Sequence, residues 1–168
     1  MPLAEITLPF ELRNVEGGSG IESIRMLFQE YQTNLAIDLS FQGFADEVAT
    51  LPGAYSPPAG RLYLALQAGE PAACAAVRPL DEEACEIKRL YVRPSQRRRG
   101  IGRMLVQRAL ADARTIGYER AVLDTLATMH EAQRLYSALG FIETAPYAAN
   151  AIAGTRFLAL ELRGGEWV

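Results

Sequence analysis

One short segment of the chain combines the residue types that bind phosphate groups. Three arginines, residues 97–99, come directly before Gly100 and Gly102, between the end of a predicted strand and the start of a predicted helix. The first N–H groups of a helix lack partners within the helix, and the helix dipole favours negative charge there. Glycines let an anion approach the backbone closely, and arginines add countercharge. The segment therefore predicts a site for a phosphate or pyrophosphate group.

Two common phosphate-binding loops do not fit this segment. A Walker loop ends in Gly-Lys-Ser/Thr, and a Rossmann fingerprint needs the three glycines of G-x-G-x-x-G. The remaining alternative is a solvated basic run that caps a helix. The combination of a strand, Pro94, arginines, glycines and a helix favours the anion site over that alternative.

Regular elements must hold this segment on both sides. We predict a strand over residues 86–92, which Pro94 stops because proline cannot donate to a sheet ladder. The helix that follows should end at Gly117, and its apolar face consists of Ile101, Met104, Leu105, Ala109, Ala113 and Ile116. A buried strand over residues 120–126 comes next. A further helix has Ala132, Leu135, Tyr136 and Leu139 on one face and Gly140 as its C-cap.

The rest of the chain supplies more strands and helices. We predict an edge strand at residues 6–13, a turn at 17–20, helices at 21–31 and 41–51, a loop at 52–60, a hairpin of strands 61–66 and 72–77 turning at 69–71, and strands at 141–144 and 155–162. This order indicates a mixed sheet with helices packed on it. The fold class is therefore α/β (α+β) and differs from a purely doubly wound fold.

Composition narrows the class of protein. The 168 residues suit a single domain, 1–168, and 49% hydrophobic with 22% charged residues allow an ordinary globular core. A net charge of −3 argues against nucleic acid or an anionic membrane as a partner. No apolar run approaches the roughly 20 residues that span a bilayer. Residues 1–5 lack the pattern of a signal peptide, so we predict a cytoplasmic protein.

The cysteines and the histidine are not expected to do chemistry. Cys74 and Cys85 are the only cysteines and lie in apolar, strand-like surroundings, so we predict reduced, buried thiols and no metal site. His130 is the only histidine, so a catalytic Cys-His pair could not form without it. We expect His130 to be a solvated residue in the first turn of its helix.

Two motifs resemble those of one family. The run from Leu90 to Gly102 resembles the acetyl-CoA pyrophosphate loop of the GNAT superfamily, whose core pattern is Arg/Gln-x-x-Gly-x-Gly/Ala. Arg97, Gly100 and Gly102 fill the three defining positions. Residues 132–141, Ala-x-x-Leu-Tyr-x-x-x-Gly-Phe, resemble the second signature helix of the family. The two motifs lie within residues 85–142.

The resemblance implies the GNAT acyl-CoA N-acyltransferase fold, with a central mixed, mostly antiparallel sheet flanked by helices. It also implies acetyl-CoA (coenzyme A) as co-substrate, whose pantetheine arm lies where the strand before the loop splays from its neighbour. The residues implied to contact CoA are Leu90, Tyr91, Val92, Arg97, Arg98, Arg99, Gly100, Ile101, Gly102 and Arg103. Many members carry Asn seven residues before the helix tyrosine. Met129 stands there instead, a departure that leaves the pyrophosphate loop untouched.

Two residues are candidates for proton transfer. Acetyl transfer needs a neutral amine and a proton for the thiolate leaving group. Glu86 lies fourteen positions before Gly100, where some family members carry a glutamate as general base. Its alternative role is that of an exposed strand-end carboxylate paired with Lys88. Tyr136 matches the family tyrosine near the CoA sulfur, which can act as general acid, although a core tyrosine would serve equally on that apolar stripe.

The predicted function is N-acetyl transfer from acetyl-CoA to a primary amine of a small molecule, amino acid or peptide, by direct attack in a ternary complex. A non-catalytic acyl-CoA-binding module or sensor is the alternative. Another acyl chain, an O-acceptor and a homodimer stay open. The residues that select the acceptor should lie outside the two motifs. The segments outside the motifs contain Phe28, Tyr31, Phe41, Phe44, Tyr55, Tyr147 and Asn150. We expect most of these aromatic residues in the core.

Overall fold

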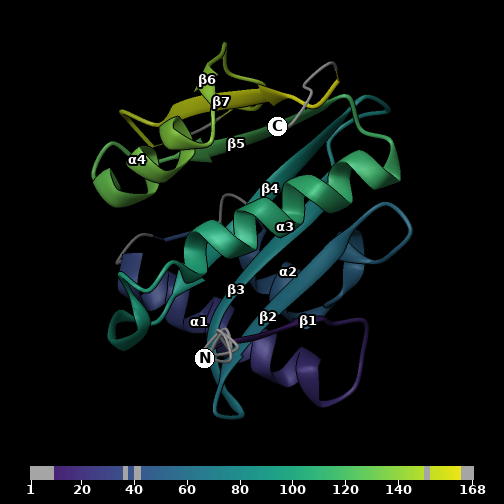
Figure 1. Cartoon of the computed structure of the whole chain (residues 1–168), viewed down its shortest axis with the longest axis vertical. Helices are drawn as coiled ribbons and strands as arrows, with labels where there is room; N and C mark the ends of the chain where they lie inside the picture. Colours follow the sequence, from purple (N-terminus) through teal and green to yellow (C-terminus); the bar gives the residue numbers. More distant parts are fainter. Residues whose placement is uncertain (1–9, 36–37, 40–42, 150–151, 164–168) are drawn as a thin grey trace, which may run out of the picture.

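One sheet runs through the computed structural model, which describes residues 10–35, 38–39, 43–149 and 152–163 (Figure 1). Its strand order is β1-β2-β3-β4-β5-β7-β6. The strands are β1 Glu11–Asn14, β2 Arg61–Gln67, β3 Glu70–Pro79, β4 Ala84–Val92, β5 Arg120–Thr125, β6 Ile142–Glu143 and β7 Arg156–Glu161. Neighbouring strands are antiparallel except β4 and β5, which are parallel. The predicted mixed, mostly antiparallel sheet is confirmed.

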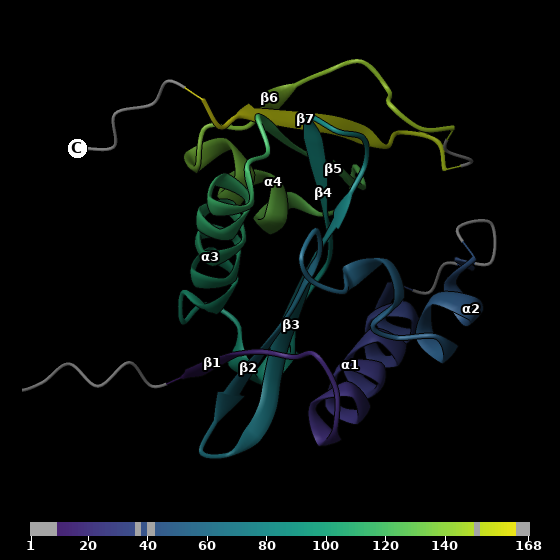
Figure 2. The same ribbon diagram turned by 90° about the vertical axis from the view of Figure 1, so that its right-hand side faces the viewer.

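Helices cover both faces of this sheet (Figure 2). Helices α1 (Ser19–Leu35) and α2 (Phe44–Ala49) lie on one face, and α3 (Ile101–Ile116) and α4 (His130–Ala138) lie on the other. Two short 3-10 helices, η2 (Gly53–Tyr55) and η3 (Pro94–Gln96), complete the described elements. Because both faces are covered, the central strands are buried on both sides and read as near-continuous apolar runs.

Alternation along β2 divides the core in two. Tyr63 and Ala65 belong to the apolar cluster under α3, whereas Leu62, Leu64 and Leu66 belong to the cluster under α1 and α2. Successive side chains of a strand point to opposite faces, so one strand supplies both clusters. The sheet is therefore a middle layer between two apolar clusters, and a site can be placed on it from either side.

Glycines end the two helices of the α3 face. Gly117 has φ 113°, and its N–H bonds the carbonyls of Ala113 and Arg114 at the end of α3, as predicted. Helix α4 ends one residue earlier than expected, with Leu139 as C-cap and Gly140, φ 97°, in the following position. Only glycine adopts such angles without steric cost.

Several boundaries differ from the prediction. The hairpin turns at Ala68 and Gly69, both with positive φ, so Glu70 already belongs to β3. Two-residue hairpins need such angles to match the strand twist. Helix α1 begins at Ser19, inside the predicted turn, and α2 is shorter than predicted. Of the predicted edge strand at 6–13, the first residues lie outside the described residues, as do Phe41 and Asn150.

Both cysteines are free and buried, as predicted. Burial raises the pKa of the Cys85 thiol to about 12 and also raises the pKa of Cys74, so both stay protonated near neutral pH. Within the described part of the chain, no helix is long and apolar enough to cross a membrane.

Candidate active site

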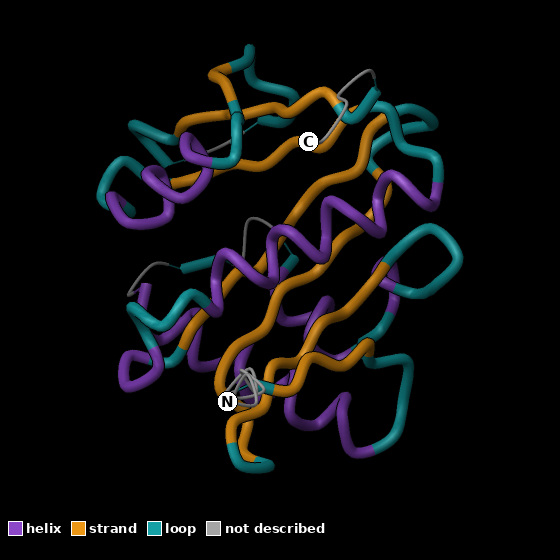
Figure 3. Tube along the Cα trace, viewed as in Figure 1, coloured by secondary structure: helices purple, strands orange, loops and turns teal. Residues whose placement is uncertain are grey.

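Strands β4 and β5 separate along their length (Figure 3). They pair only from Ala84 opposite Arg120 to Glu86 opposite Val122. Beyond that point β5 pairs with β7 alone, and β4 continues to Val92 beside β3. The edge of β4 that faces β5 thus loses its ladder after Glu86, and the predicted splay is present.

A bulge interrupts β4 at this opening. The register passes from Ala76 opposite Lys88 to Cys74 opposite Tyr91, so Arg89 and Leu90 share a single partner position on β3. Arg89 has φ 60°, an uncommon left-handed conformation for a residue other than glycine. A bulge redirects side chains and increases the local twist, and bulges occur often beside active sites.

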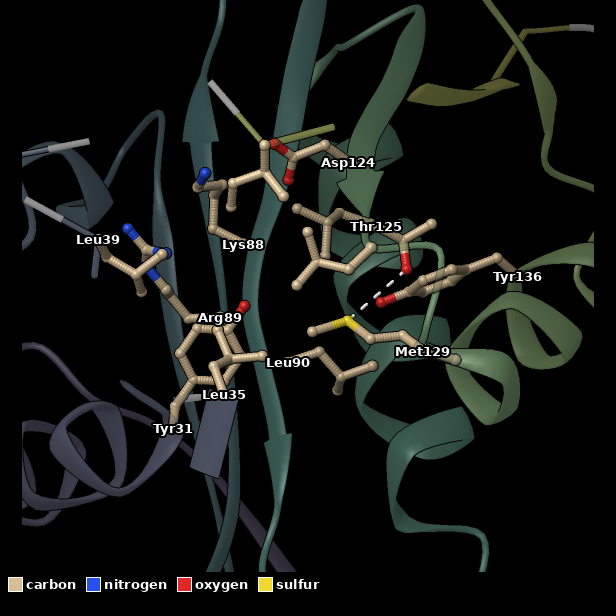
Figure 4. Close-up of a pocket in the computed structure, with 14 residues that line it drawn as sticks. Tyr31, Leu35, Leu39, Lys88, Arg89, Leu90, Asp124, Thr125, Met129 and Tyr136 are labelled. Carbon is tan, nitrogen blue, oxygen red and sulfur yellow. Dashed lines mark hydrogen bonds between the residues drawn. The ribbon is translucent and has the colours of Figure 1, made fainter. Parts of the chain in front are cut away.

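Side chains from both faces of the sheet line a cavity at the opening (Figure 4). Helix α1 and the segment after it contribute Tyr31, Leu35 and Leu39, and α4 with its preceding residue contributes Met129, Ala132 and Tyr136. Residues 87–90 of β4, 124–126 around the end of β5, and Ile152 complete the wall. The cavity therefore connects the α1 face of the sheet with the α4 face.

Tyr136 lies in this cavity, as its predicted role requires. The residue is 6% exposed, and its hydroxyl points from α4 toward β4 (Figure 4). Its ring also packs edge-on against Phe141, with centroids 5.7 Å apart. Burial raises the pKa of Tyr136 above its ordinary value of 10.0. The hydroxyl is therefore protonated near neutral pH, and the ring packs in the core.

The predicted pyrophosphate loop is exposed and ends at an open helix N-terminus. Gly100 is the N-cap of α3, with φ 80° and no side-chain cap. The first bond of the helix runs from the Met104 N–H to the Gly100 carbonyl, so the N–H groups of residues 101–103 come before the helical ladder. Arg97 donates from Nε to the Val92 carbonyl at 3.1 Å, which fixes the loop to the end of β4.

The two glycines of the loop have different surroundings. A Cβ at Gly100 would meet nothing within 4 Å, and φ is what favours glycine there. A Cβ at Gly102 would contact Leu135 Cδ2 at 3.6 Å and Val92 Cγ2 at 3.8 Å, which is ordinary packing. The open space for an anion thus lies at Gly100, whereas Gly102 faces the protein.

The three strand residues implied to contact CoA differ in their surroundings. Leu90 lines the cavity. Tyr91 is buried against the opposite core, and its hydroxyl accepts a hydrogen bond of 3.0 Å from Asn34 Nδ2. Val92 is half-buried and gives its carbonyl to Arg97. Backbone contacts of these residues with a cofactor remain a prediction.

Glu86 is buried beside the cavity, and it is not among the described residues that line it. Arg78 reaches its Oε1 with Nε at 2.9 Å and with a terminal nitrogen at 2.8 Å. The Tyr147 hydroxyl donates to Oε2 at 2.8 Å, and Lys88 Nζ lies 3.8 Å from the same oxygen. The exposed carboxylate of the alternative interpretation is wrong, since the side chain is only 4% exposed and Arg78 is its main partner. A catalytic role for Glu86 stays a prediction.

The sequence alone did not indicate the charged residues of the cavity wall, which are Lys88, Arg89 and Asp124. Lys88 and Arg89 lie at the bulge of β4, and both line the cavity, which is open to both faces of the sheet. Arg89 bonds Glu47 of α2 at 2.8 and 3.1 Å. Burial lowers the pKa of Lys88, and the nearby Glu86 carboxylate opposes that shift.

Most of the aromatic residues outside the motifs, and His130, lie in the surroundings predicted from the sequence. Phe28, Phe44 and Tyr55 are buried in the core under α1 and α2, as predicted. Tyr31 packs against the same core and also lines the cavity. His130 is exposed in the first turn of α4, as predicted.

Residues 22–141 match the Acetyltransferase (GNAT) family. An uncharacterized N-acetyltransferase of Schizosaccharomyces pombe is 39% identical over 144 residues, which cover 84% of this chain and 88% of the relative. The chain shares its fold with an acetyltransferase from Streptococcus agalactiae, with a TM-score of 0.76 at 19% identity over 91% of this chain and 98% of that one. A GNAT family acetyltransferase from Elizabethkingia anophelis with acetyl-CoA bound has a TM-score of 0.65 at 22% identity over 91% of this chain and 98% of that one.

Proposed function

The chain belongs to the GNAT acetyltransferase family, and we propose that it moves the acetyl group of acetyl-CoA to a primary amine by direct attack in a ternary complex. The observation that carries this proposal is the opening between β4 and β5. It leads from the face with the arginine loop and Tyr136 to the face of α1, so that a thioester and an amine can meet from opposite sides of the sheet.

The loop residues suit the pyrophosphate of CoA. The anion site consists of three N–H groups at the start of α3, the open space at Gly100 and the exposed arginines at 97–99. No side chain caps the helix there, so none competes with the ligand for these N–H groups. Beyond Glu86, the free edge of β4 can bind the pantetheine amides as a further strand would. A solved relative from Elizabethkingia anophelis has acetyl-CoA bound, which supports the same ligand here.

Bound acetyl-CoA supplies a thioester carbonyl for the amine to attack and a thiolate as leaving group. Tyr136 is placed to give the thiolate its proton, because its side chain lines the cavity and its hydroxyl points toward β4. A backbone N–H on the bulged part of β4 can stabilise the oxyanion. Glu86 accepts the proton of the ammonium through a water molecule, because its carboxylate does not reach the cavity wall.

Thiol release with a panel of primary amines tests this function. Acetyl-CoA-dependent thiol release that requires an amine, together with an acetylated product by mass spectrometry, is the expected result. Tight acetyl-CoA binding without release for any amine would instead identify a non-catalytic acyl-CoA-binding module. The presence of Tyr136 in the cavity favours the enzyme.

A further inference from the structure

Lys88 is the only lysine of the chain; the other basic residues among the 17 are arginines. Its side chain is 6% exposed and lines the cavity. Within the described residues Lys88 makes no hydrogen bond, and its ion-pair partner is Glu86 at 3.8 Å. An ammonium with three donors at the wall of a cavity can bind an anion that enters the cavity. Lys88 is therefore a candidate to bind an anionic group of a ligand in the cavity.

The neighbouring cations are more closely paired than Lys88. Arg78 is held by Glu86 at 2.8 and 2.9 Å, and Arg89 by Glu47 at 2.8 and 3.1 Å. Glu86 also accepts from Tyr147, so its second oxygen is shared. An anion that enters the cavity from the α1 side would gain most from Lys88.

The other residues on the α1 side of the cavity restrict the chemical nature of the ligand further. Tyr31, Leu35, Leu39 and Ile152 make the wall largely apolar. Asp124 on β5 faces Lys88 across the opening in Figure 4. An acceptor that fits must offer one negative charge, a nearby ammonium group and an apolar remainder.

We propose that the acceptor is an α-amino acid with an apolar side chain, whose carboxylate binds Lys88 and whose ammonium group is received at Asp124. This inference rests on the proposed acetyl transfer to an amine. A carboxylate matches a single ammonium, whereas a phosphate monoester carries up to two charges and is best held by an arginine fork. Polyamines are poor ligands here, since Lys88 and Arg89 would repel a second ammonium.

Three matched acceptors test the proposal: L-leucine, L-leucinamide and 3-methylbutylamine, which share a side chain and differ in the carboxylate. The wild type should use leucine with a kcat/KM about 10–100-fold above the other two, the range for a hydrogen bond to a charged group. Lys88→Met should remove this preference, and Lys88→Arg should restore part of it. Arg108→Met removes an exposed cation of α3 and should leave the preference unchanged.

A second readout does not depend on turnover. With ¹³C-lysine labelling, the single lysine gives one set of side-chain NMR signals. Leucine should shift the Hε–Cε signal in the presence of CoA, and leucinamide should not. An unmoved signal with leucine, or a preference for O-phosphoethanolamine over leucine, would overturn the carboxylate site.

Failure of this inference can be told from failure of the proposed function. If no amine releases thiol, acetyl transfer itself is refuted. If simple amines react and the carboxylate confers no advantage, only the amino-acid proposal is refuted. Gain of one acetyl group by the wild type alone with acetyl-CoA, absent in Lys88→Met, would make Lys88 an acceptor and also overturn the proposal.

Discussion

The hydroxyl of Tyr147 donates a hydrogen bond of 2.8 Å to Oε2 of Glu86, across 61 residues of sequence. Tyr147 belongs to the segment between β6 and β7, which also places Ile152 at the cavity wall. Burial and the Glu86 charge raise the pKa of Tyr147, so the hydroxyl remains a donor. Glu86 thereby fixes this segment to β4 beside the point where β4 and β5 separate.

The variant Glu86→Gln separates a catalytic role of Glu86 from this positioning role. A proton acceptor should be needed near neutral pH, so the rate of the variant should drop sharply there. At high pH the amine arrives neutral and the acceptor is dispensable, so the rate of the variant should partly recover. The measurement is the pH–rate profile with one amine at saturating acetyl-CoA. Tyr147→Phe is the control, since it removes the hydrogen bond between Tyr147 and Glu86 and keeps the Glu86 carboxylate.

Stability gives an independent check on Glu86. Loss of its carboxylate leaves Arg78 without its main partner, and we expect a cost of about 1–3 kcal/mol, which lowers Tm by about 2–4 °C per kcal/mol. A lower Tm with a pH–rate profile that superimposes on the wild type would leave Glu86 a purely structural residue.

Tyr136→Phe removes one hydroxyl from the cavity. If Tyr136 protonates the thiolate, turnover should fall roughly 10²-fold, the lower end for proton-transfer catalysis. Stability should change little, because the ring keeps its contact with Phe141. The comparison is kcat against Tm for the two proteins. Full activity in the folded variant would assign Tyr136 to the core alone.

Two glycines at opposite ends of α3 form a matched pair for testing the CoA loop. Gly100 and Gly117 have φ 80° and 113°, and a Cβ at either would meet nothing within 4 Å. Gly100→Ala and Gly117→Ala should therefore cost a similar amount, about 1–2 kcal/mol. Only Gly100→Ala should weaken acetyl-CoA binding, as measured by calorimetry, and Gly100→Glu should abolish it.

Binding to this loop should also weaken as salt increases, because the pyrophosphate is charged and the arginines are exposed. Equal acetyl-CoA affinities in Gly100→Ala and Gly117→Ala, or an affinity independent of salt, would place the cofactor elsewhere.

Lys88→Met should raise Tm by a few degrees at neutral pH, because it removes a buried ammonium that makes no hydrogen bond within the described residues. The folded pKa of Lys88 is lowered below 10.5, whereas the unfolded chain keeps the ordinary value. Between these two values the unfolded chain binds the extra proton, so the wild type gains stability as pH rises through that window. The difference in Tm between variant and wild type should shrink toward alkaline pH, and a difference that grows would contradict the assignment.

The sequence by itself determined the parts that depend on near neighbours. Backbone angles at the glycines determine where α3 begins and that it ends at Gly117. The apolar spacing within α4 places Tyr136 on the inner face of that helix. Both depend only on angles and contacts within a few turns of helix. The arginine loop could be assigned to a phosphate for the same reason, because a helix N-terminus has its unpaired N–H groups and dipole whatever lies around it.

Only the tertiary structure decided how the cavity is built. The separation of β4 from β5 after Glu86 and the bulge at Arg89 depend on pairing between strands that are distant in sequence. Residues 87–90 of β4 all line the cavity because the separation of the strands opens it to both faces of the sheet. The hydrogen-bond partners of Glu86 are Arg78 of β3 and Tyr147. Burial and pairing of a charge are set by such long-range contacts, which no local pattern of residues encodes.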